Sequence, residues 1–240
     1  MNSHSHDAIA VIIGRAGSKG LPGKNSRMVC GLPMVAHAIG HARDSRHVSM
    51  VAVSTDGDEI ARAARETGTD VVMRPPLLAG DTASVDGAVR HAVESMGVSH
   101  RIVVILYANV PVRPVGLVDR AVEHLVATGA DSVQSYESVG KKHPWWMSRM
   151  DEDGRIAPWH RNDVYRRQDL PEVWFPDGGV IAVTRESLFN VDPDAPHSFL
   201  GSDRRGIRNG PGEVIDVDDE IDLMVAEAIL HREKTSQTAS

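Results

Sequence analysis

Several residue types and patterns are scarce in this chain. A single cysteine, Cys30, excludes an intramolecular disulfide and fits a reducing compartment. No apolar run approaches the roughly 18 residues that a transmembrane helix needs, and the apolar stretch between Asp7 and Arg15 is too short for a signal peptide. The formal net charge is -7 at pH 7, and no broad basic face is indicated. We therefore expect a cytoplasmic protein that binds neither membranes nor nucleic acid.

Acidic residues are absent from one stretch of this acidic chain, between Asp7 and Asp44. The first half of that stretch follows the apolar run 8–13 and is rich in glycine and cations: Gly14, Arg15, Gly17, Lys19, Gly20, Gly23, Lys24 and Arg27. Glycine permits positive φ angles and close backbone approach, so main-chain N–H groups can surround a phosphate. The loop therefore predicts a site for a nucleoside triphosphate.

Two common phosphate-binding motifs do not fit this loop. The dinucleotide fingerprint G-x-G-x-x-G fails because Ala16 stands where its second glycine belongs. The P-loop motif fails because Ser18 stands at its first glycine and Asn25 replaces its Ser or Thr. A glycine-rich turn with solvated cations remains the structural alternative.

Apolar runs of strand length alternate with helix patterns through the first part of the chain, 1–136. We predict strands at 8–13, 48–53, 101–107 and 132–136, and helices at 34–43, 58–67, 85–96 and 115–127. This alternation predicts a doubly wound, mostly parallel α/β sheet with right-handed crossovers and a ligand crevice at the carboxyl ends of its strands. The glycine-rich loop lies at such an end.

The alternation stops in segment 137–176, which we interpret as an inserted lobe. It holds all four tryptophans, and the turn signal at 151–154 predicts a hairpin between 146–150 and 155–159. Tryptophan is enriched at interfaces and a short hairpin is marginal alone, so we favour a dimerisation lobe over aromatics that pack only the lobe itself. We expect a homodimer.

Segment 177–231 returns to the core, with predicted strands at 178–184 and 213–217 and a helix at 219–231, and we expect 232–240 to be a disordered tail. No Lys or Arg lies between Arg208 and Arg232, whereas six carboxylates lie within 213–222. Asp216 and Asp218 share one face of the predicted strand end, and two hard carboxylates suit Mg²⁺ together with substrate phosphates. A solvated acidic turn before a capped helix is the alternative.

These motifs together resemble the CMP-sialic acid synthetases, or acylneuraminate cytidylyltransferases. The matching positions run in order along the chain: Arg15, Gly17-Ser18-Lys19-Gly20-Leu21-Pro22, Lys24-Asn25, Ser54-Thr55-Asp56, Arg74-Pro75, Asp81-Thr82-Ala83-Ser84, Arg167-Gln168-Asp169-Leu170-Pro171, Asp216-Val217-Asp218 and Asp222. The resemblance implies a fold like that of nucleotide-diphospho-sugar transferases. It also implies Mg²⁺-dependent transfer of CMP from CTP to a sialic-acid-like nonulosonic acid, with release of pyrophosphate.

The resemblance also implies roles for individual residues. Arg15, Lys19 and Lys24 would bind the triphosphate and stabilise charge on the leaving pyrophosphate. The other nucleotide-binding candidates are Gly14, Gly17, Ser18, Asn25, Arg74 and Ser84. Asp216 and Asp218 would hold the metal ion.

The acceptor region departs from the family pattern. Segment 107–113 lacks the usual Gln-Pro-Thr start, and Asp177-Gly178-Gly179 replaces Asn-Gly-Ala. The candidate sugar ligands are Asn109, Arg113, Arg167 and Gln168. The alternatives are a nucleotidyltransferase for another sugar or base, such as GTP with a sugar 1-phosphate, and a nucleotide-sensing module without turnover.

Overall fold

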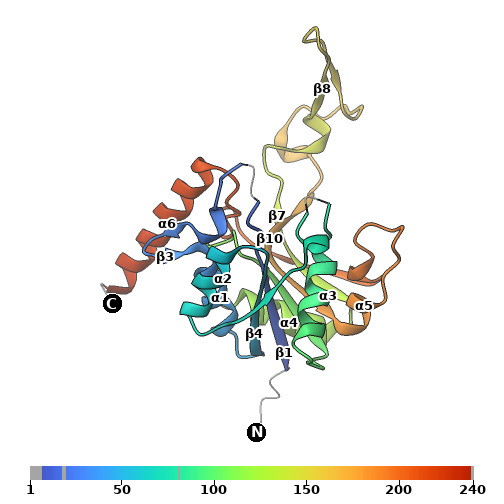
Figure 1. Ribbon diagram of the computed structural model, residues 1–240. Helices are drawn as coiled ribbons and strands as arrows, with labels where there is room; N and C mark the ends of the chain where they lie inside the picture. The colour runs from blue at the N-terminus through green and yellow to red at the C-terminus, as the bar shows by residue number, and fades with distance from the viewer. Residues whose placement is uncertain (1–6, 18–19, 81, 239–240) are drawn as a thin grey trace.

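The computed structural model describes residues 7–17, 20–80 and 82–238, and within these ranges seven strands form one central sheet in the order β11-β7-β10-β6-β1-β4-β5. Figure 1 shows this α/β body with a narrow lobe projecting from it. The strands of the sheet are β1 (Ala8–Ile13), β4 (Val48–Thr55), β5 (Asp70–Met73), β6 (Ile102–Tyr107), β7 (Ser132–Ser138), β10 (Trp174–Thr184) and β11 (Arg204–Arg208). Only β10 pairs antiparallel with its neighbours β6 and β7 among these described strands, so the predicted mostly parallel α/β sheet is confirmed.

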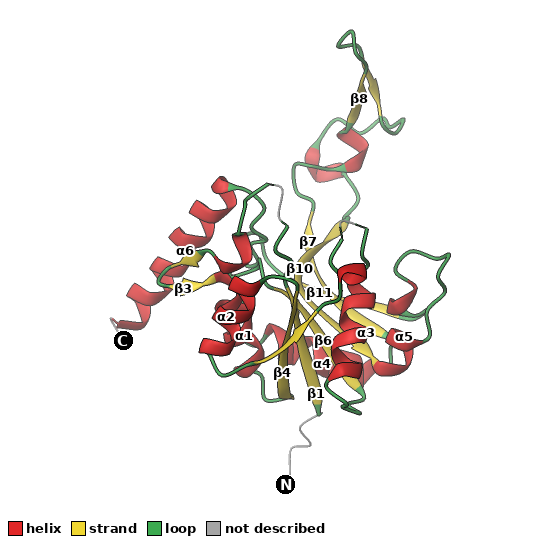
Figure 2. Ribbon diagram, viewed as in Figure 1, coloured by secondary structure: helices red, strands yellow, loops and turns green. Residues whose placement is uncertain are grey.

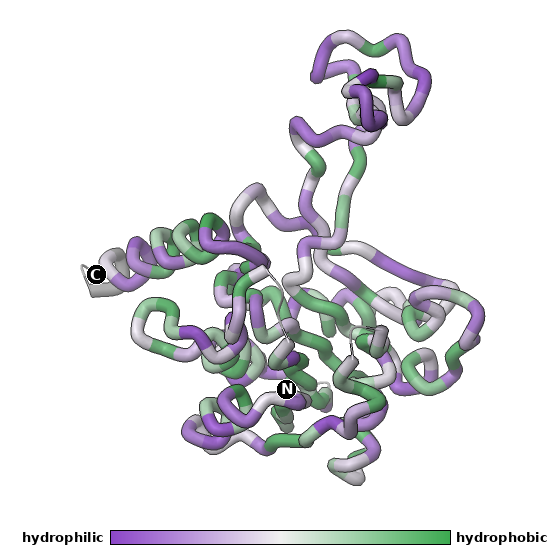
Figure 3. The backbone as a smooth tube through the Cα atoms, turned by 45° about the horizontal axis from the view of Figure 1, so that its top comes forward, coloured by the Kyte–Doolittle hydropathy of each residue, from purple (hydrophilic) through white to green (hydrophobic). Residues whose placement is uncertain are grey.

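Helices cover both faces of the sheet (Figure 2). They are α1 (Met34–Arg43), α2 (Asp58–Glu66), α3 (Val85–Ser95), α4 (Leu117–Thr128), α5 (Arg185–Phe189) and α6 (Glu220–Thr238). Successive residues of β1 point to opposite faces: Ala10 and Ile12 pack with α1, α2 and α4, whereas Ile9 and Val11 pack with α3 and α5. Burial on both sides explains the continuous apolar run of β1, and Figure 3 shows the hydrophobic segments concentrated in the central strands.

Smaller elements complete the described chain. A hairpin of β2 (Met28–Val29) and β3 (Leu32–Pro33) packs beside α6, which also buries Leu223 and Ala226 in the same cluster as Val29. Short 3-10 helices lie at η1 (Lys24–Ser26), η2 (Pro76–Leu78), η3 (Pro144–Trp146), η4 (Arg167–Asp169) and η5 (Ser198–Leu200). None of the described helices is long and apolar enough to span a bilayer.

The lobe lies between β7 and β10 and carries the predicted hairpin, here β8 (Ser148–Met150) and β9 (Ile156–Pro158). Its large apolar side chains are exposed: Met150 is 72% exposed, Ile156 69% and Trp159 51%. The lobe therefore presents an apolar surface that the described chain leaves in solvent.

Several segments differ from the sequence-based expectations. Segment 213–217 is not a strand, since only Ile215 forms an isolated bridge, to Val112. Helix α6 continues past His231 to Thr238, so the predicted tail is helical through residue 238; residues 232–234, Arg-Glu-Lys, are strong helix formers. The sequence pattern does not predict strands β5 and β11. For β11 the reason is that this short edge strand carries three arginines in place of an apolar pattern.

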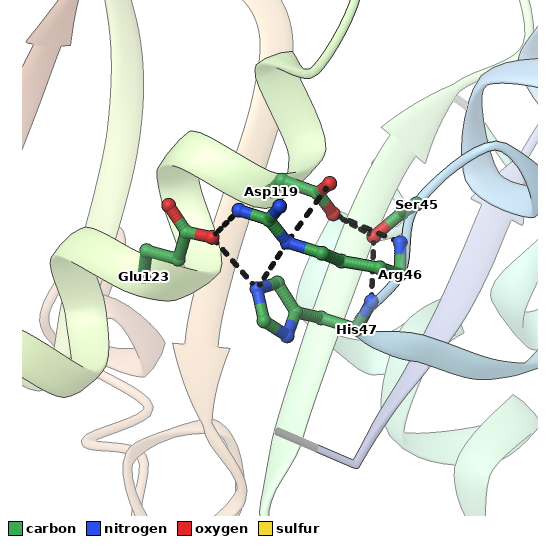
Figure 4. A network of polar contacts seen from close by, with 5 residues as sticks. All are labelled: Ser45, Arg46, His47, Asp119 and Glu123. Atoms are coloured by element: carbon green, nitrogen blue, oxygen red, sulfur yellow. Dashed lines mark hydrogen bonds and ion pairs between the residues drawn. The ribbon is translucent and has the colours of Figure 1, made fainter. Parts of the chain in front are cut away.

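A polar network joins the start of β4 to α4 on the side of the molecule away from the lobe (Figure 4). Ser45 Oγ donates to Asp119 Oδ1 at 2.5 Å, and His47 Nε2 lies 2.9 Å from Glu123 Oε1, which also pairs with Arg46. These contacts hold a helix against the sheet far from the loop at the carboxyl ends of β1 and β4.

Candidate active site

The glycine-rich loop is anchored to the ends of β1 and β4. Gly14 N donates to Ser54 O at 3.2 Å. The peptide bond between Arg15 and Ala16 is held on both edges, because Asn25 Nδ2 donates to Arg15 O at 2.9 Å and Ala16 N donates to Asp56 Oδ1 at 2.9 Å. This arrangement fixes the backbone from which the Arg15 side chain extends. Ser18 and Lys19, two of the predicted phosphate ligands, lie outside the described residues.

The loop also contacts the acidic segment from the other end of the chain. Lys24 Nζ lies 2.6 Å from Asp218 Oδ1 and 3.1 Å from Val217 O. Gly20 approaches so closely that a Cβ there would lie 2.7 Å from Asp218 O, so this position requires glycine. The cationic and acidic stretches of the sequence therefore form one site.

A cavity of about 280 Å³ opens beside the loop. It brings together seven of the predicted site residues: Gly14, Arg15, Lys24, Asn25, Arg74, Ser84 and Asn109. Gly17 is exposed and is not among the lining residues. Asn25 is only 3% exposed, and its Oδ1 has no hydrogen-bond partner within the described chain. A buried acceptor without a donor favours a bound ligand that supplies one.

Arg74 and Ser84 also line this cavity. Arg74 Nε donates to Ser54 Oγ at 2.9 Å and Nη2 donates to Ser54 O at 2.8 Å, which holds the guanidinium in place. Burial lowers the pKa of Arg74, and the nearby Asp56 carboxylate opposes that shift. Ser84 Oγ accepts from Gly87 N at 3.1 Å and so caps α3, while its hydroxyl hydrogen stays available to a ligand.

A second cavity, of about 210 Å³, adjoins the first. Tyr107 lines both cavities, and the smaller one is completed by Gln134, Ser135, Pro176, Gly178, Val180, Ile181 and Asp216. Asn109, from the larger cavity, donates a short hydrogen bond to Asp216 in the smaller one. Sequence reasoning missed Tyr107, Gln134 and Ser135, although each lies on a predicted strand. The available signal was their position in the carboxyl halves of the predicted strands, because ligands of α/β sheets bind at the carboxyl ends of strands.

The Asp216 carboxyl is the most perturbed acid of the site. Burial and, to a smaller extent, the neighbouring Asp218 carboxylate raise its pKa to about 6, although Lys24 and Arg113 act in the opposite direction. Two adjacent hard carboxylates, one of them desolvated, are a donor set that suits Mg²⁺. In the part of the chain that is described, no group of three or more His, Cys, Asp or Glu could hold a metal ion. The two aspartates therefore fit an ion that takes its other ligands from phosphate and water.

Arg113 is not positioned to bind a sugar. It is 4% exposed, and its guanidinium donates to three main-chain carbonyls: Gly179 O at 2.6 Å, Tyr107 O at 2.9 Å and Val110 O. Burial lowers its pKa to about 9, against the attraction of Asp216 and Asp177. Arg113 is therefore not a direct sugar ligand, contrary to the expectation from the sequence. Its guanidinium instead holds the main chain that forms the cavity wall.

Arg167 and Gln168 are also separate from the cavities. Both are exposed in η4, within the lobe, and neither is among the residues that line the two cavities. Of the four candidate sugar ligands, only Asn109 lies at the site within one chain.

Comparison with known proteins places this geometry in context. A family model described as cytidylyltransferase matches residues 9–169. The N-acylneuraminate cytidylyltransferase of Streptococcus agalactiae serotype V is 31% identical over 182 residues, which are 75% of this chain and 44% of that relative. This chain therefore spans less than half the length of the streptococcal relative.

One further curated relative and one solved structure match over nearly their full length. The CMP-N,N'-diacetyllegionaminic acid synthase of Legionella pneumophila is 30% identical over 231 residues, covering 92% of this chain and 95% of the relative. Among solved structures, CMP:2-keto-3-deoxy-manno-octonic acid synthetase complexed with CTP has a TM-score of 0.72 at 19% identity, covering 95% of this chain and 99% of that one. The structural likeness shows a shared fold.

Proposed function

The chain belongs to the cytidylyltransferase family, as a member similar to the CMP-sialic acid synthetases, and on that basis we propose that it transfers CMP from CTP to a sialic-acid-like nonulosonic acid. The observation that carries the proposal is the larger cavity, where seven residues singled out by the nucleotide and acceptor motifs meet. Named relatives that act on nonulosonic acids support the acceptor class.

The larger cavity would hold CTP. Arg15 and Lys24 would bind the triphosphate, and the unpartnered Oδ1 of Asn25 would accept a hydrogen bond from the nucleotide. Arg74 and Ser84, which also line this cavity, would contact the base. Gly17, Ser18 and Lys19 belong to the same loop, and their roles stay predictions.

The smaller cavity would hold the acceptor. It meets the nucleotide cavity at Tyr107 and at the Asn109–Asp216 hydrogen bond, so a hydroxyl group there would face the α-phosphate. Gln134 and Ser135 supply polar groups that a sugar hydroxyl can use.

The reaction exchanges one bond to phosphorus for another. The anomeric hydroxyl oxygen of the acceptor bonds to the α-phosphorus, the bond to the bridging oxygen of pyrophosphate breaks, and the hydroxyl proton is released. Positioning of the two substrates and neutralisation of phosphate charge supply the catalysis in such transfers. Arg15 and Lys24 would stabilise the negative charge that grows on pyrophosphate.

Mg²⁺ is part of the proposal. Asp216 and Asp218 would hold the ion, and a bound ion would neutralise charge on the phosphates. The ion pair between Lys24 and Asp218 places a cation beside the same carboxylates in its absence.

A homodimer is the proposed assembly, with the lobe as the pairing surface and a second copy as the partner. The exposed side chains of Met150, Ile156 and Trp159 support this, because apolar and aromatic side chains are enriched at interfaces. The roles of Arg167 and Gln168 as sugar ligands stay predictions. The cytoplasmic location expected from the sequence stays a prediction.

Nucleotide choice tests the proposal against the alternative of another base. Thermal unfolding of the full chain is measured with Mg²⁺ and CTP, UTP, ATP or GTP. A ligand at 100 times its dissociation constant stabilises the folded state by about 2.7 kcal/mol, so CTP should raise the melting temperature and the other three should not at equal concentration. A larger shift with GTP would favour the sugar 1-phosphate alternative.

A further inference from the structure

A buried polar network lies behind the smaller cavity, and its central carboxylate has no role in the proposed reaction. At its centre is Asp177, which is 7% exposed. Its Oδ1 accepts from Ser135 Oγ and from Gly179 N, the latter at 2.9 Å, and its Oδ2 accepts from Asn209 Nδ2 at 2.7 Å. Three donors therefore satisfy this carboxylate without direct contact with a cationic side chain among the described residues.

The network binds a stretch of β10 that does not pair regularly with the neighbouring strand. The pairing of β10 with β7 loses its register between Pro176 and Ile181. Within that bulge, Gly179 O accepts from Arg113 Nε at 2.6 Å and Val180 N donates to Ser135 Oγ at 3.0 Å. The peptide bond between Gly179 and Val180 is thus fixed on both edges by side chains. Bulges of this kind re-aim a strand beside a functional site.

The bulge abuts the two residues that border the cavities. Gly178 has a φ of 76°, and a Cβ there would lie 3.4 Å from Asp216 Oδ2 and 3.8 Å from Tyr107 Cδ2. The guanidinium of Arg113 donates to Gly179 O and also to Tyr107 O, the latter at 2.9 Å. Displacement of the bulge would therefore move the wall of the smaller cavity relative to Asp216 and Tyr107.

We infer that Asp177 is a positioning residue that, through Ser135 and the Gly179–Val180 peptide bond, fixes the wall of the smaller cavity against Asp216. This inference rests on the proposed function in calling that cavity the acceptor site. Its consequence is selective: loss of the Asp177 carboxylate impairs use of the acceptor and leaves nucleotide binding intact, because the network does not reach the loop or Arg74. A carboxylate that only stabilised the fold would affect both substrates together.

The test compares Asp177→Ala and Ser135→Ala with Asp203→Ala in the full chain. Asp203 is a matched control, since its carboxylate is 44% exposed and pairs with Arg205 at 2.6 Å on the surface. In Asp177→Ala we expect kcat/KM for the acceptor to fall by about 10- to 100-fold while the dissociation constant for CTP changes by less than about twofold. Ser135→Ala should show the same split with a smaller loss, and Asp203→Ala should behave like the wild type.

Hydrogen exchange gives a second readout that needs no turnover. The amides of residues 178–180 and 214–217 should exchange faster in Asp177→Ala than in the wild type, whereas the amides of β1 should not change. Unchanged exchange at 178–180 and 214–217 overturns the inference, as does a parallel loss of acceptor use and CTP binding in both variants. A wild-type chain that releases no pyrophosphate with any acceptor refutes the proposed function instead, and the exchange measurement still decides the role of Asp177.

Discussion

Lys24 Nζ lies 2.6 Å from Asp218 Oδ1, so an ion pair joins residues separated by 194 positions in the sequence. Lys24 belongs to the stretch without acids, and Asp218 belongs to the stretch without cations. The two stretches are complementary halves of one site, and a metal-bound triphosphate is a ligand that interacts with both. This relationship underlies the predictions that follow.

Removal of the Lys24 ammonium should abolish most turnover. Lys24→Ala is expected to lower kcat for pyrophosphate release by about 100- to 1,000-fold, because charge that develops on the leaving group loses a positioned cation. Arg62→Ala, on the exposed face of α2, is the control and should keep wild-type kinetics. Steady-state pyrophosphate release measures both variants, and an unchanged rate in Lys24→Ala would refute the role of Lys24.

The carboxylates of Asp216 and Asp219 should differ in their effect on metal dependence. Asp216→Asn is expected to raise the Mg²⁺ concentration for half-maximal activity by about tenfold or more. Asp219 lies in the same acidic segment but caps α6, with Oδ1 accepting from Ile221 N at 2.8 Å, and Asp219→Asn preserves a cap. Mg²⁺ titrations after treatment with a chelator test this, and equal shifts in the two variants would indicate a general charge effect instead of a metal site.

Folding stability should fall as the pH drops, partly because of His41. Burial and, to a smaller extent, the nearby Arg113 guanidinium lower the pKa of His41 to about 4, so the folded state keeps this imidazole neutral. The unfolded chain binds the proton near pH 6.5, and the resulting stability is lost as the pH falls from about 6.5 towards 4.

A comparison with His41→Gln isolates this contribution. Between pH 7.5 and pH 5, the wild type should lose about 1–2 kcal/mol more unfolding free energy than the variant, from 1.36 kcal/mol per pKa unit over the window. Chemical denaturation at the two pH values provides the measurement. Identical pH dependence in the two proteins would show that His41 is not held neutral.

The lobe should control self-association. Met150→Ser combined with Ile156→Ser is expected to weaken a dimer by about 10- to 100-fold, because both side chains are exposed in one chain and would be buried by a second. Val115→Ser is the control, since Val115 is 98% exposed but lies outside the lobe. Light scattering with size-exclusion chromatography measures the mass. A wild-type chain that is monomeric at all concentrations contradicts the proposed pairing.

The sequence predicted those elements whose burial leaves a pattern. The run 8–13 is apolar throughout because both faces of β1 are covered, and α1 coincides with its predicted bounds. In contrast, β11 lies at the edge of the sheet, where Arg204, Arg205 and Arg208 face solvent, so no apolar period marks it.

Site residues divide in the same way. Arg15, Lys24 and Asn25 come from one local motif, and the structure brings them to one cavity. Arginine is a residue type that often binds anions, but the partners of Arg113 are main-chain carbonyls. One of them is Gly179 O, in a bulge that lies far from Arg113 in the sequence. A contact of this kind depends on the tertiary fold, which the local sequence around Arg113 does not encode.

The most direct measurement of the central claim is pyrophosphate release by the full chain with Mg²⁺, each of the four nucleoside triphosphates, and a panel of nonulosonic acids. We expect release only when CTP and a nonulosonic acid are both present, with formation of the CMP-sugar. Release with GTP and a sugar 1-phosphate, or binding of CTP without release for every acceptor in the panel, would contradict it.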